Sequence, residues 1–389
     1  MKRTVRTANF ILVMCWFAWI VNYLNRMILP PLLPLIIPEM HLSLTEAGLL
    51  MSGFMFGYAV MPLPSGMLAD RYGRKIVLVF GMLGYSAFTF LSAFTTTFAQ
   101  LFLCRVLTGL SQGTHLSVAN SLLSDFFPSS RRGRAIGIHE SGPNVGSTIA
   151  MPFAAVIGAF SGWRPVFALA ALFGLVMAVL FYSLVPETTR ESKPVVRKER
   201  KLTNLAGWWG PLLPFILAFS GYTFSNWALY TFTPIYLSSK GLELVTVGLV
   251  FAILPFVGIF SKILGGTISD LVDRRKVIVG ALALLGSLMY LLTLMSGTVE
   301  IAVLLGFLGF VLFSFSPVVY ARVSELYDAS ERSSAIGAVS TIGNLVGAIS
   351  PALVGFVADQ AGFQVSFYLI AAVVLACALS SAFVMRRHT

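Results

Sequence analysis

The sequence predicts an all-α polytopic membrane protein whose twelve transmembrane helices form two pseudo-symmetric six-helix bundles. Three observations lead to this prediction. Of the 389 residues, 57% are hydrophobic and only 11% are charged, whereas soluble domains carry about 25% charged residues. Apolar runs of about 20 residues, long enough to cross a bilayer, recur from end to end. One constant offset of 200 residues aligns the second half of the chain with the first.

The offset is clearest in a short charged turn between two apolar runs. This turn is Gly66-Met-Leu-Ala-Asp70-Arg71-Tyr-Gly73-Arg74-Lys75, and a weaker copy begins at Gly266. The same offset aligns Gly48-Leu49 with Gly248-Leu249, Ser124-Asp125 with Ser324-Glu325, and Asn144 with Asn344. A repeat of this length indicates a duplicated half-protein rather than a solenoid unit.

Each half contains six predicted helices. None of the apolar runs alternates with the period of a barrel strand, so helices are expected. The runs cover about 8–37, 46–69, 76–95, 98–124, 134–160 and 165–185, then 210–238, 245–269, 276–296, 299–324, 333–358 and 363–385. The expected domains are residues 1–185 and 207–389, joined by a polar cytoplasmic linker at 186–206.

The net charge of +11 reflects membrane topology rather than a nucleic-acid partner. Nearly all lysine and arginine residues fall on one side of the predicted helices, and only Arg164 and Lys240 fall in the opposite loops. The positive-inside rule therefore predicts an inner-membrane protein with both termini in the cytoplasm. The first apolar run lacks a small-residue cleavage site and is expected to be retained. Three cysteines inside predicted helices imply no disulfide.

The charged turn at 66–75 and its weaker copy resemble the loop signature of the major facilitator superfamily, and the resemblance covers the whole chain. It implies two six-helix halves related by an axis along the membrane normal. It also implies a latch in which an acid meets the N-terminus of a facing helix, worth about 0.3–1 kcal/mol. The implied latch residues are Gly66, Asp70, Arg71, Gly73 and Arg74, with Asp270 and Arg274 in the second half.

Two stretches resemble the organic anion:cation symporters within that superfamily. Asn22-Tyr-Leu-Asn25-Arg26 resembles the Asn-Tyr-x-Asp-Arg pattern of their first helix. Arg105, followed seven residues later by Gln112, resembles the Arg and Glu of their fourth. The resemblance implies transport of an organic anion. Because Asn25 and Gln112 replace the two acids implicated in proton coupling, coupling to H⁺ or Na⁺, exchange and facilitated diffusion all stay open.

Arg26 and Arg105 are candidate substrate-binding residues on physical grounds as well. An arginine in the middle of a membrane helix costs roughly 2.5–3.5 kcal/mol, so a function is expected for it. The planar guanidinium matches a carboxylate, and no embedded acid shares these helix faces. The alternative is a structural pairing with amides or carbonyls. Further candidates that would orient or enclose the anion are Asn22, Asn25, Gln112, Tyr222, Asn226 and Tyr230.

A proton-coupling site would come from His115, His139 or Glu140. Histidine titrates near neutral pH, and Glu140 is the only acid that lies more than one residue inside the end of a predicted helix. The alternative for Glu140 is an ion pair with Arg134 in an inner gate. Lys262 either reaches toward the membrane interface or points into the cavity.

The sequence contains no nucleotide-binding P-loop, metal-ligand cluster or nucleophile elbow. We therefore expect no enzyme, no catalytic or metal site and no cofactor. We predict a monomeric secondary active transporter that works by alternating access. Its expected substrate is a small organic anion, and a carboxylate is the favoured kind. Two alternatives stay open: an exporter of drugs or metabolites, for which Gly142-Pro143-x-x-Gly146 is a partial motif, and a non-transporting sensor or assembly protein.

Overall fold

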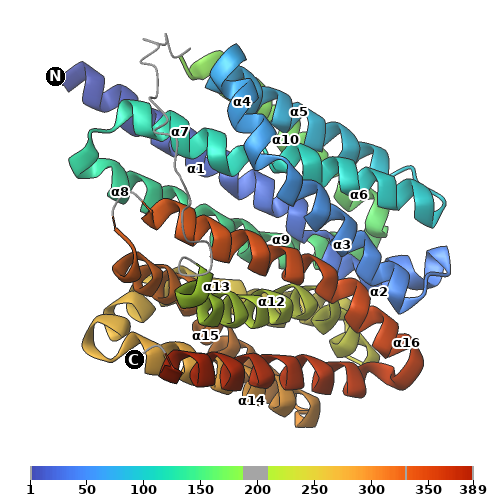
Figure 1. The fold of residues 1–389 in the computed structure, drawn as a ribbon. Helices are drawn as coiled ribbons and strands as arrows, with labels where there is room; N and C mark the ends of the chain where they lie inside the picture. Colours follow the sequence, from blue (N-terminus) through green and yellow to red (C-terminus); the bar gives the residue numbers. More distant parts are fainter. Residues whose placement is uncertain (1, 187–208, 329–330, 388–389) are drawn as a thin grey trace.

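The structure is a computed structural model that describes residues 2–186, 209–328 and 331–387. Within these ranges every regular element is a helix (Figure 1), which confirms the all-α prediction. The predicted linker lies outside the described residues from position 187 onward. The division into domains at this linker therefore stays a prediction.

In the described part of the chain, ten helices precede the linker and five follow it, together with one short 3₁₀ helix. The first set is α1 (Lys2–Met27), α2 (Leu29–Met40), α3 (Leu44–Val60), α4 (Pro62–Tyr72), α5 (Arg74–Ser92), α6 (Phe98–Gln112), α7 (His115–Phe126), α8 (Ser129–His139), α9 (Gly142–Ser161) and α10 (Trp163–Leu184). The second set is η1 (Gly210–Leu212), α12 (Leu213–Ser239), α13 (Leu244–Leu271), α14 (Arg274–Leu294), α15 (Thr298–Leu326) and α16 (Arg332–Arg387).

The helices account for the twelve predicted spans. Nine segments in the described ranges are long and apolar enough to cross a membrane, and the bent pair α3–α4 adds a tenth. The remaining two spans appear when α16 is divided at Gly362 and the broken pair α6–α7 is counted as one span. Gly362 has φ 84°, a backbone conformation that glycine adopts without strain, and it separates the last two spans.

Four spans of the first half are broken, whereas α13 and α15 are continuous. The pair α3–α4 bends by 44° at Met61. The other breaks separate α1 from α2, α6 from α7, and α8 from α9. Pro62 and Pro143 occupy one of the first two positions of α4 and α9, where the missing N–H group needs no helical partner. These prolines explain two of the four breaks, and Pro30 occupies an equivalent position at the start of α2.

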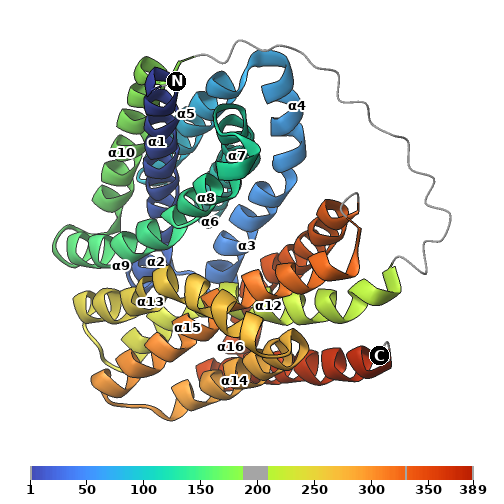
Figure 2. The same ribbon diagram turned by 90° about the vertical axis from the view of Figure 1, so that its left-hand side faces the viewer.

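The two halves pack together on one side and diverge on the other. Figure 2 shows α4 and α7 separating from α12 and α16, while α9 lies against α13. Packing between the halves is formed mainly by α3 against α16 and by α9 against α13. Both ends of the chain lie on the same side of the molecule (Figure 1).

Glycines at equivalent positions of the repeat permit this close packing. A Cβ atom on Gly48 of α3 would lie 2.1 Å from the carbonyl oxygen of Pro351 on α16. A Cβ atom on Gly248 of α13 would lie 2.8 Å from the carbonyl oxygen of Met151 on α9. A larger residue would force the backbones apart, so glycine sets the helix separation. We call these two contacts the glycine seam.

A carboxylate fastens the end of the glycine seam. Asp359 of α16 accepts hydrogen bonds from the backbone N–H groups of Leu44 and Thr45, both at 2.8 Å, and from the Thr45 hydroxyl at 2.5 Å. Leu44 and Thr45 begin α3, where N–H groups lack helical partners and carry partial positive charge. Asp359 therefore caps a helix of the opposite half.

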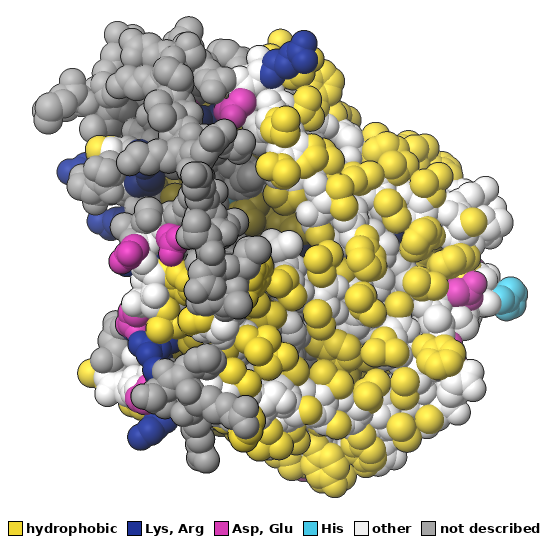
Figure 3. Space-filling view, viewed as in Figure 1, with side chains coloured by type: hydrophobic (Ala, Val, Ile, Leu, Met, Phe, Trp, Pro, Cys, Tyr) yellow, Lys and Arg dark blue, Asp and Glu magenta, His cyan; other side chains and the backbone are white. Residues whose placement is uncertain are grey.

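The outer surface is apolar over most of its area. Figure 3 shows hydrophobic side chains across the body of the molecule, with charged groups mainly at its edges. Large apolar residues such as Phe80, Phe160 and Leu379 are exposed. Soluble monomers rarely expose apolar patches of this extent, so the chain is a multi-pass membrane protein that contacts lipid.

Candidate substrate-binding site

A cavity of about 210 Å³ lies between the two halves. The first half contributes α1 and the α8–α9 region, and the second half contributes α12, α13, α15 and α16. Polar groups share its wall with aromatic rings, as expected for a site that both encloses and orients a ligand. The polar and ionisable lining residues are Tyr23, Glu140, Asn144, Ser147, Tyr222, Thr223, Asn226, Tyr230, Lys262, Ser316, Tyr320 and Asn344.

Three of the candidate residues lie in this wall on the second half. Tyr222, Asn226 and Tyr230 all belong to α12 and occupy successive turns of it. At four residues apart they share one face of the helix. The face is held by α16, since the Thr223 hydroxyl donates a hydrogen bond to the Gly343 carbonyl at 2.5 Å.

Arg26 lies one layer behind the cavity wall. It is buried, and its guanidinium carbon lies 4.2 Å from the ring centres of both Tyr23 and Tyr58. Its Nε atom donates a hydrogen bond to Gln112 Oε1 at 3.2 Å, and Gln112 Nε2 donates to the Asn22 carbonyl at 3.1 Å. The tyrosine at position 23, which lines the cavity, therefore separates Arg26 from it.

Arg105 is buried deeper, without a counter-charge. Its guanidinium carbon lies 4.7 Å from the ring centre of Phe54, and Arg26 lies 5.1 Å from the same ring. None of its three guanidinium nitrogens has a hydrogen-bond partner among the described residues. A buried cation without a partner is strongly unfavourable, so this position is suited to an arriving anion.

The two predicted asparagines differ in their contacts. Both side-chain polar atoms of Asn22 lack a partner among the described residues, so this amide is available to a ligand. Asn25 Nδ2 instead donates to the carbonyls of Val21 and Ala170, at 3.0 and 2.9 Å. Asn25 thus ties α1 to α10, whereas Asn22 contacts Gln112 through its backbone carbonyl.

The three candidate coupling residues lie together at the breaks in the first half. His115 begins α7, His139 ends α8, and their Nε2 atoms are 3.3 Å apart. Glu140 follows directly and lines the cavity. Its Oε1 atom lies 3.7 Å from His139 Nδ1, a contact that becomes an ion pair only when His139 is protonated. An ion pair with Arg134 is not found among the described residues. Lys262 also lines the cavity, and its Nζ donates to the Glu140 backbone carbonyl at 3.1 Å.

The latch residues form ion pairs at equivalent positions of the two halves. Arg74 pairs with Asp125 and donates to the Ser121 carbonyl at 2.7 Å, and Arg274 pairs with Glu325. Gly73 has φ 97°, which lets the chain turn between α4 and α5.

The other latch predictions have different outcomes. Asp70 and Arg71 are exposed at the end of α4. A Cβ atom on Gly66 would meet nothing within 4 Å, so no close contact requires glycine there in this conformation. The side chain of Asp270 lies outside the described residues.

Sequence reasoning missed Tyr23 and Asp359. Tyr23 stands inside the stretch that resembles the symporter motif, between Asn22 and Asn25, so its position was a usable signal. Asp359 directly follows the predicted span 333–358 and carries no signal in sequence that separates it from an ordinary loop acid. Only the structure brings it to the start of α3.

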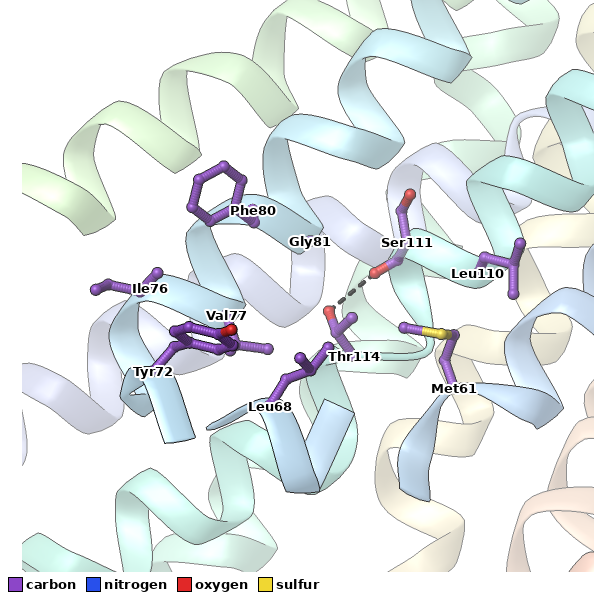
Figure 4. Close-up of a pocket in the computed structure, with 10 residues that line it drawn as sticks. All are labelled: Met61, Leu68, Tyr72, Ile76, Val77, Phe80, Gly81, Leu110, Ser111 and Thr114. Carbon is purple, nitrogen blue, oxygen red and sulfur yellow. Dashed lines mark hydrogen bonds between the residues drawn. The ribbon is translucent and has the colours of Figure 1, made fainter. Parts of the chain in front are cut away.

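A second, larger cavity of about 490 Å³ lies on the outer face of the first half. Figure 4 shows it between α4, α5 and α6, next to the break where the Thr114 hydroxyl donates to the Ser111 carbonyl at 2.9 Å. Tyr72 and Phe80 line it and are exposed on the apolar surface. Its lining is almost entirely apolar and includes no charged side chain, so it does not fit an anion.

Comparisons with known proteins agree with this geometry. The family model described as the Major Facilitator Superfamily matches residues 15–314 and 246–389. The hexuronate transporter of Bacillus subtilis strain 168 is 27% identical over 385 residues, covering 93% of this chain and 90% of that protein. The cis,cis-muconate transport protein of Acinetobacter baylyi strain ADP1 is 27% identical over 387 residues, with 93% and 90% covered.

A solved structure shares the fold. The crystal structure of a bacterial homologue of the human lysosomal transporter Spinster, in an inward-facing and unoccupied conformation, matches with a TM-score of 0.86 at 19% identity. The match covers 98% of this chain and 97% of that chain. Since the family model also matches most of the sequence, this chain belongs to the Major Facilitator Superfamily.

Proposed function

We propose that this protein is a secondary transporter that moves a small organic anion, bearing at least one carboxylate, across the membrane by alternating access. The observation that carries the proposal is the pair of buried arginines beside the central cavity. Arg105 has no hydrogen-bond partner among the described residues, and Arg26 uses only part of its fork. A carboxylate would satisfy both, because its two oxygens match the donors of a guanidinium.

The relatives support an organic anion as the substrate. One is named for a hexuronate and the other for cis,cis-muconate, and both of these compounds carry carboxylates. Membership of the superfamily makes the chain a transporter rather than an enzyme. Among the described residues no cluster of potential metal ligands is present.

The cavity and the arginines would form one site when Tyr23 moves. Tyr23 stacks on Arg26 and also lines the cavity, so a change in its side-chain rotamer would expose the guanidinium to a bound anion. Tyr222, Asn226 and Tyr230 would then hydrogen-bond the rest of the substrate. Lys262 supplies a further positive group on the same wall.

The conformation fits the inward-open state of the transport cycle. The halves diverge on the side of both termini, which the positive-inside rule places in the cytoplasm. The glycine seam and Asp359 would close the opposite, outer side. This assignment includes an inner-membrane location, a cytoplasmic linker at 186–206 and a monomer as the working unit.

A thermal-shift experiment tests the substrate class. Purified protein is heated with D-glucuronate, cis,cis-muconate, the neutral sugar D-glucose or the cation tetraphenylphosphonium. A ligand that binds the folded state at 100 times its Kd stabilises it by about 2.7 kcal/mol. We expect a higher Tm with one of the anions and no change with D-glucose.

Variants of Arg105 connect the shift to the site. Arg105→Ala is expected to abolish the anion-induced shift, and Arg105→Lys, which keeps the charge without the planar fork, to reduce it. Stabilisation by tetraphenylphosphonium alone would contradict the proposal and favour an exporter of cations. An anion shift without uptake into proteoliposomes would favour a non-transporting sensor.

A further inference from the structure

The histidine pair at the centre of the first half is a polar cluster that substrate binding does not use. His115 and His139 are buried, with 2% and 0% of their surfaces exposed. Their Nε2 atoms are 3.3 Å apart, which is a hydrogen-bond distance between two ring nitrogens. One ring must donate and the other accept, since two N–H groups or two lone pairs facing each other at this distance would repel.

The nearby carboxylate favours one assignment. His139 Nδ1 and the carboxylate of Glu140 are 3.7 Å apart, too far for a hydrogen bond, but the negative charge attracts a proton to that nitrogen. With that proton in place, His139 Nε2 carries a lone pair and accepts the Nε2–H of His115. The neutral pair is then directed from His115 to His139, and the Glu140 carboxylate lies beside its far end. Glu140 opens into the central cavity.

A proton added to this histidine pair has a defined binding position. It binds at Nδ1 of His115 while the shared proton moves from His115 Nε2 to His139 Nε2. The pair changes from charge 0 to +1, and no other group gains or loses a proton. The charge rests on His139, because that ring ends α8, where the helix dipole favours a cation, and because it faces Glu140. His115 begins α7, where a cation is disfavoured.

From this geometry we infer that the His115–His139 pair binds the single proton that is transported with the anion. The inference rests on the proposed anion-transport function. The pair replaces two acids that the sequence lacks, since positions 25 and 112 hold amides. It also lies between two helix breaks, so its protonation acts directly on elements that can bend.

Other charged and titratable groups couple proton binding to anion binding. The groups that interact electrostatically with the pair or with Glu140 are Arg26 and Tyr23 on α1, Lys262 on α13 and Tyr320 on α15. The positive charge of Arg26 opposes a second positive charge on the histidines. A carboxylate bound at Arg26 neutralises this charge, so the anion promotes proton binding. Linkage requires the reverse as well: a protonated pair binds the anion more tightly.

Trp19 provides a direct readout of the pair. Its indole stacks on both imidazoles, with ring centres 4.3 Å from His115 and 5.7 Å from His139. A protonated imidazole quenches a stacked indole because it accepts an electron from the excited ring. The Trp19 signal is obtained as the difference between the fluorescence of the protein and that of Trp19→Phe. It is recorded between about pH 5 and pH 9, the range in which histidine titrates.

We expect one transition, with quenching at low pH, that is lost in His139→Gln and in His115→Asn. Loss in both variants, each shown to be folded by its melting temperature, identifies the pair rather than a single ring. A Trp19 signal that stays flat over the range would overturn the inference. A transition that keeps its midpoint and amplitude in both variants would also overturn the inference, because the group that titrates would then lie outside the histidine pair.

The same titration separates this inference from the proposed function. D-glucuronate or cis,cis-muconate is expected to move the midpoint to higher pH by linkage. A transition that neither anion moves, in a protein that also fails to take them up, would contradict the transport proposal and, with it, the coupling of the proton to an anion, while protonation of the pair itself would stand. Anion uptake by proteoliposomes without any Trp19 transition would contradict the proton site alone.

Discussion

Positions 200 residues apart make equivalent contacts at the edges of the molecule but not in its centre. Arg74 pairs with Asp125, and Arg274 pairs with Glu325. The glycine seam likewise repeats, since Gly48 and Gly248 meet the carbonyls of residues 351 and 151. In the centre, Arg26 corresponds to Asn226, and Arg105 corresponds to a leucine at position 305.

This difference separates moving parts from binding parts. The shared contacts lie where the halves close against each other or where a turn is fastened, and a rocking motion needs such contacts in both halves. The differing positions line or adjoin the central cavity. Among the described residues, both fully buried arginines belong to the first half. The second half offers tyrosine and asparagine side chains and one cation, Lys262. We therefore expect the first half to supply most of the charge recognition and the second half to supply the shape.

The strongest test of this difference between the halves places the asparagine of position 226 at the equivalent position 26 of the first half. Arg26→Asn replaces a charge-assisted contact and is expected to weaken anion binding by about 2–5 kcal/mol, at least about thirtyfold in Kd. Asn226→Ala removes at most neutral hydrogen bonds, worth about 0.5–1.5 kcal/mol, or about two- to tenfold. Calorimetric titration with D-glucuronate measures both. Equal losses in the two variants would show that recognition is shared between the halves.

The helices were predictable because hydrophobic length is a local property of the chain and because the 200-residue repeat can be read directly from the sequence. The candidate site was only partly predictable. Arg105 and Arg26 were visible as charges in apolar runs, but Tyr23, which separates Arg26 from the cavity, was not identified. The roles of the candidate residues stay predictions.

Contacts between distant residues left no trace in the sequence. The pairing of His115 with His139 depends on breaks in two different spans, and only one of the breaks lies next to a proline. Asp359 reaches α3 from 315 positions away, and it has no counterpart because residue 159 is an alanine. Such contacts depend on how the halves are placed, which composition and periodicity do not specify.

Closing of the outer side is tested at the glycine seam. In Gly48→Ala the new methyl group would lie 2.1 Å from a backbone oxygen, so α3 and α16 must separate. Overpacking of this kind typically costs 1–3 kcal/mol, which would lower the population of the closed outer side by about 5- to 150-fold. Gly248→Ala is expected to act in the same direction.

Ser52 reports on the opening of this seam. Its hydroxyl accepts a hydrogen bond from the Ala352 N–H at 3.2 Å, so it is buried between α3 and α16. Ser52→Cys is introduced after Cys15, Cys104 and Cys377 are replaced by alanine. An impermeant maleimide added outside is expected to label it faster in Gly48→Ala. Gly280→Ala, whose methyl would meet nothing within 4 Å, serves as the control, and equal labelling in both would refute the seam's role.

A smaller effect is expected at the carboxylate that only the second half possesses. Asp359→Ala removes the acceptor of the first two N–H groups of α3, while Ser43 still accepts from the Glu46 N–H. A cap is worth about 0.5–2 kcal/mol, so the variant is expected to raise the labelling rate of Ser52→Cys by about two- to thirtyfold. Asp359→Asn keeps one acceptor and should give an intermediate rate. Because Asp359 is exposed, high salt should reduce the difference. The adjacent variant Gln360→Ala is the control, and an equal increase there would exclude a specific cap.

The smallest effects are expected at the repeated ion pairs, because both are partly exposed. Exposed pairs contribute about 0.2–1 kcal/mol, so neither Arg74→Gln nor Arg274→Gln should change uptake by more than about fivefold. The two should still differ. Glu325 also accepts a hydrogen bond from Arg322 at 2.7 Å, so it keeps a cationic partner after Arg274→Gln. Arg74→Gln is therefore expected to have the larger effect.

Proteoliposome uptake rates give the order of the two effects. Restored uptake on combining Arg74→Asp with Asp125→Arg would assign the effect to the ion pair. A larger loss in Arg274→Gln would show that the second latch carries more of the closing energy than its contacts indicate.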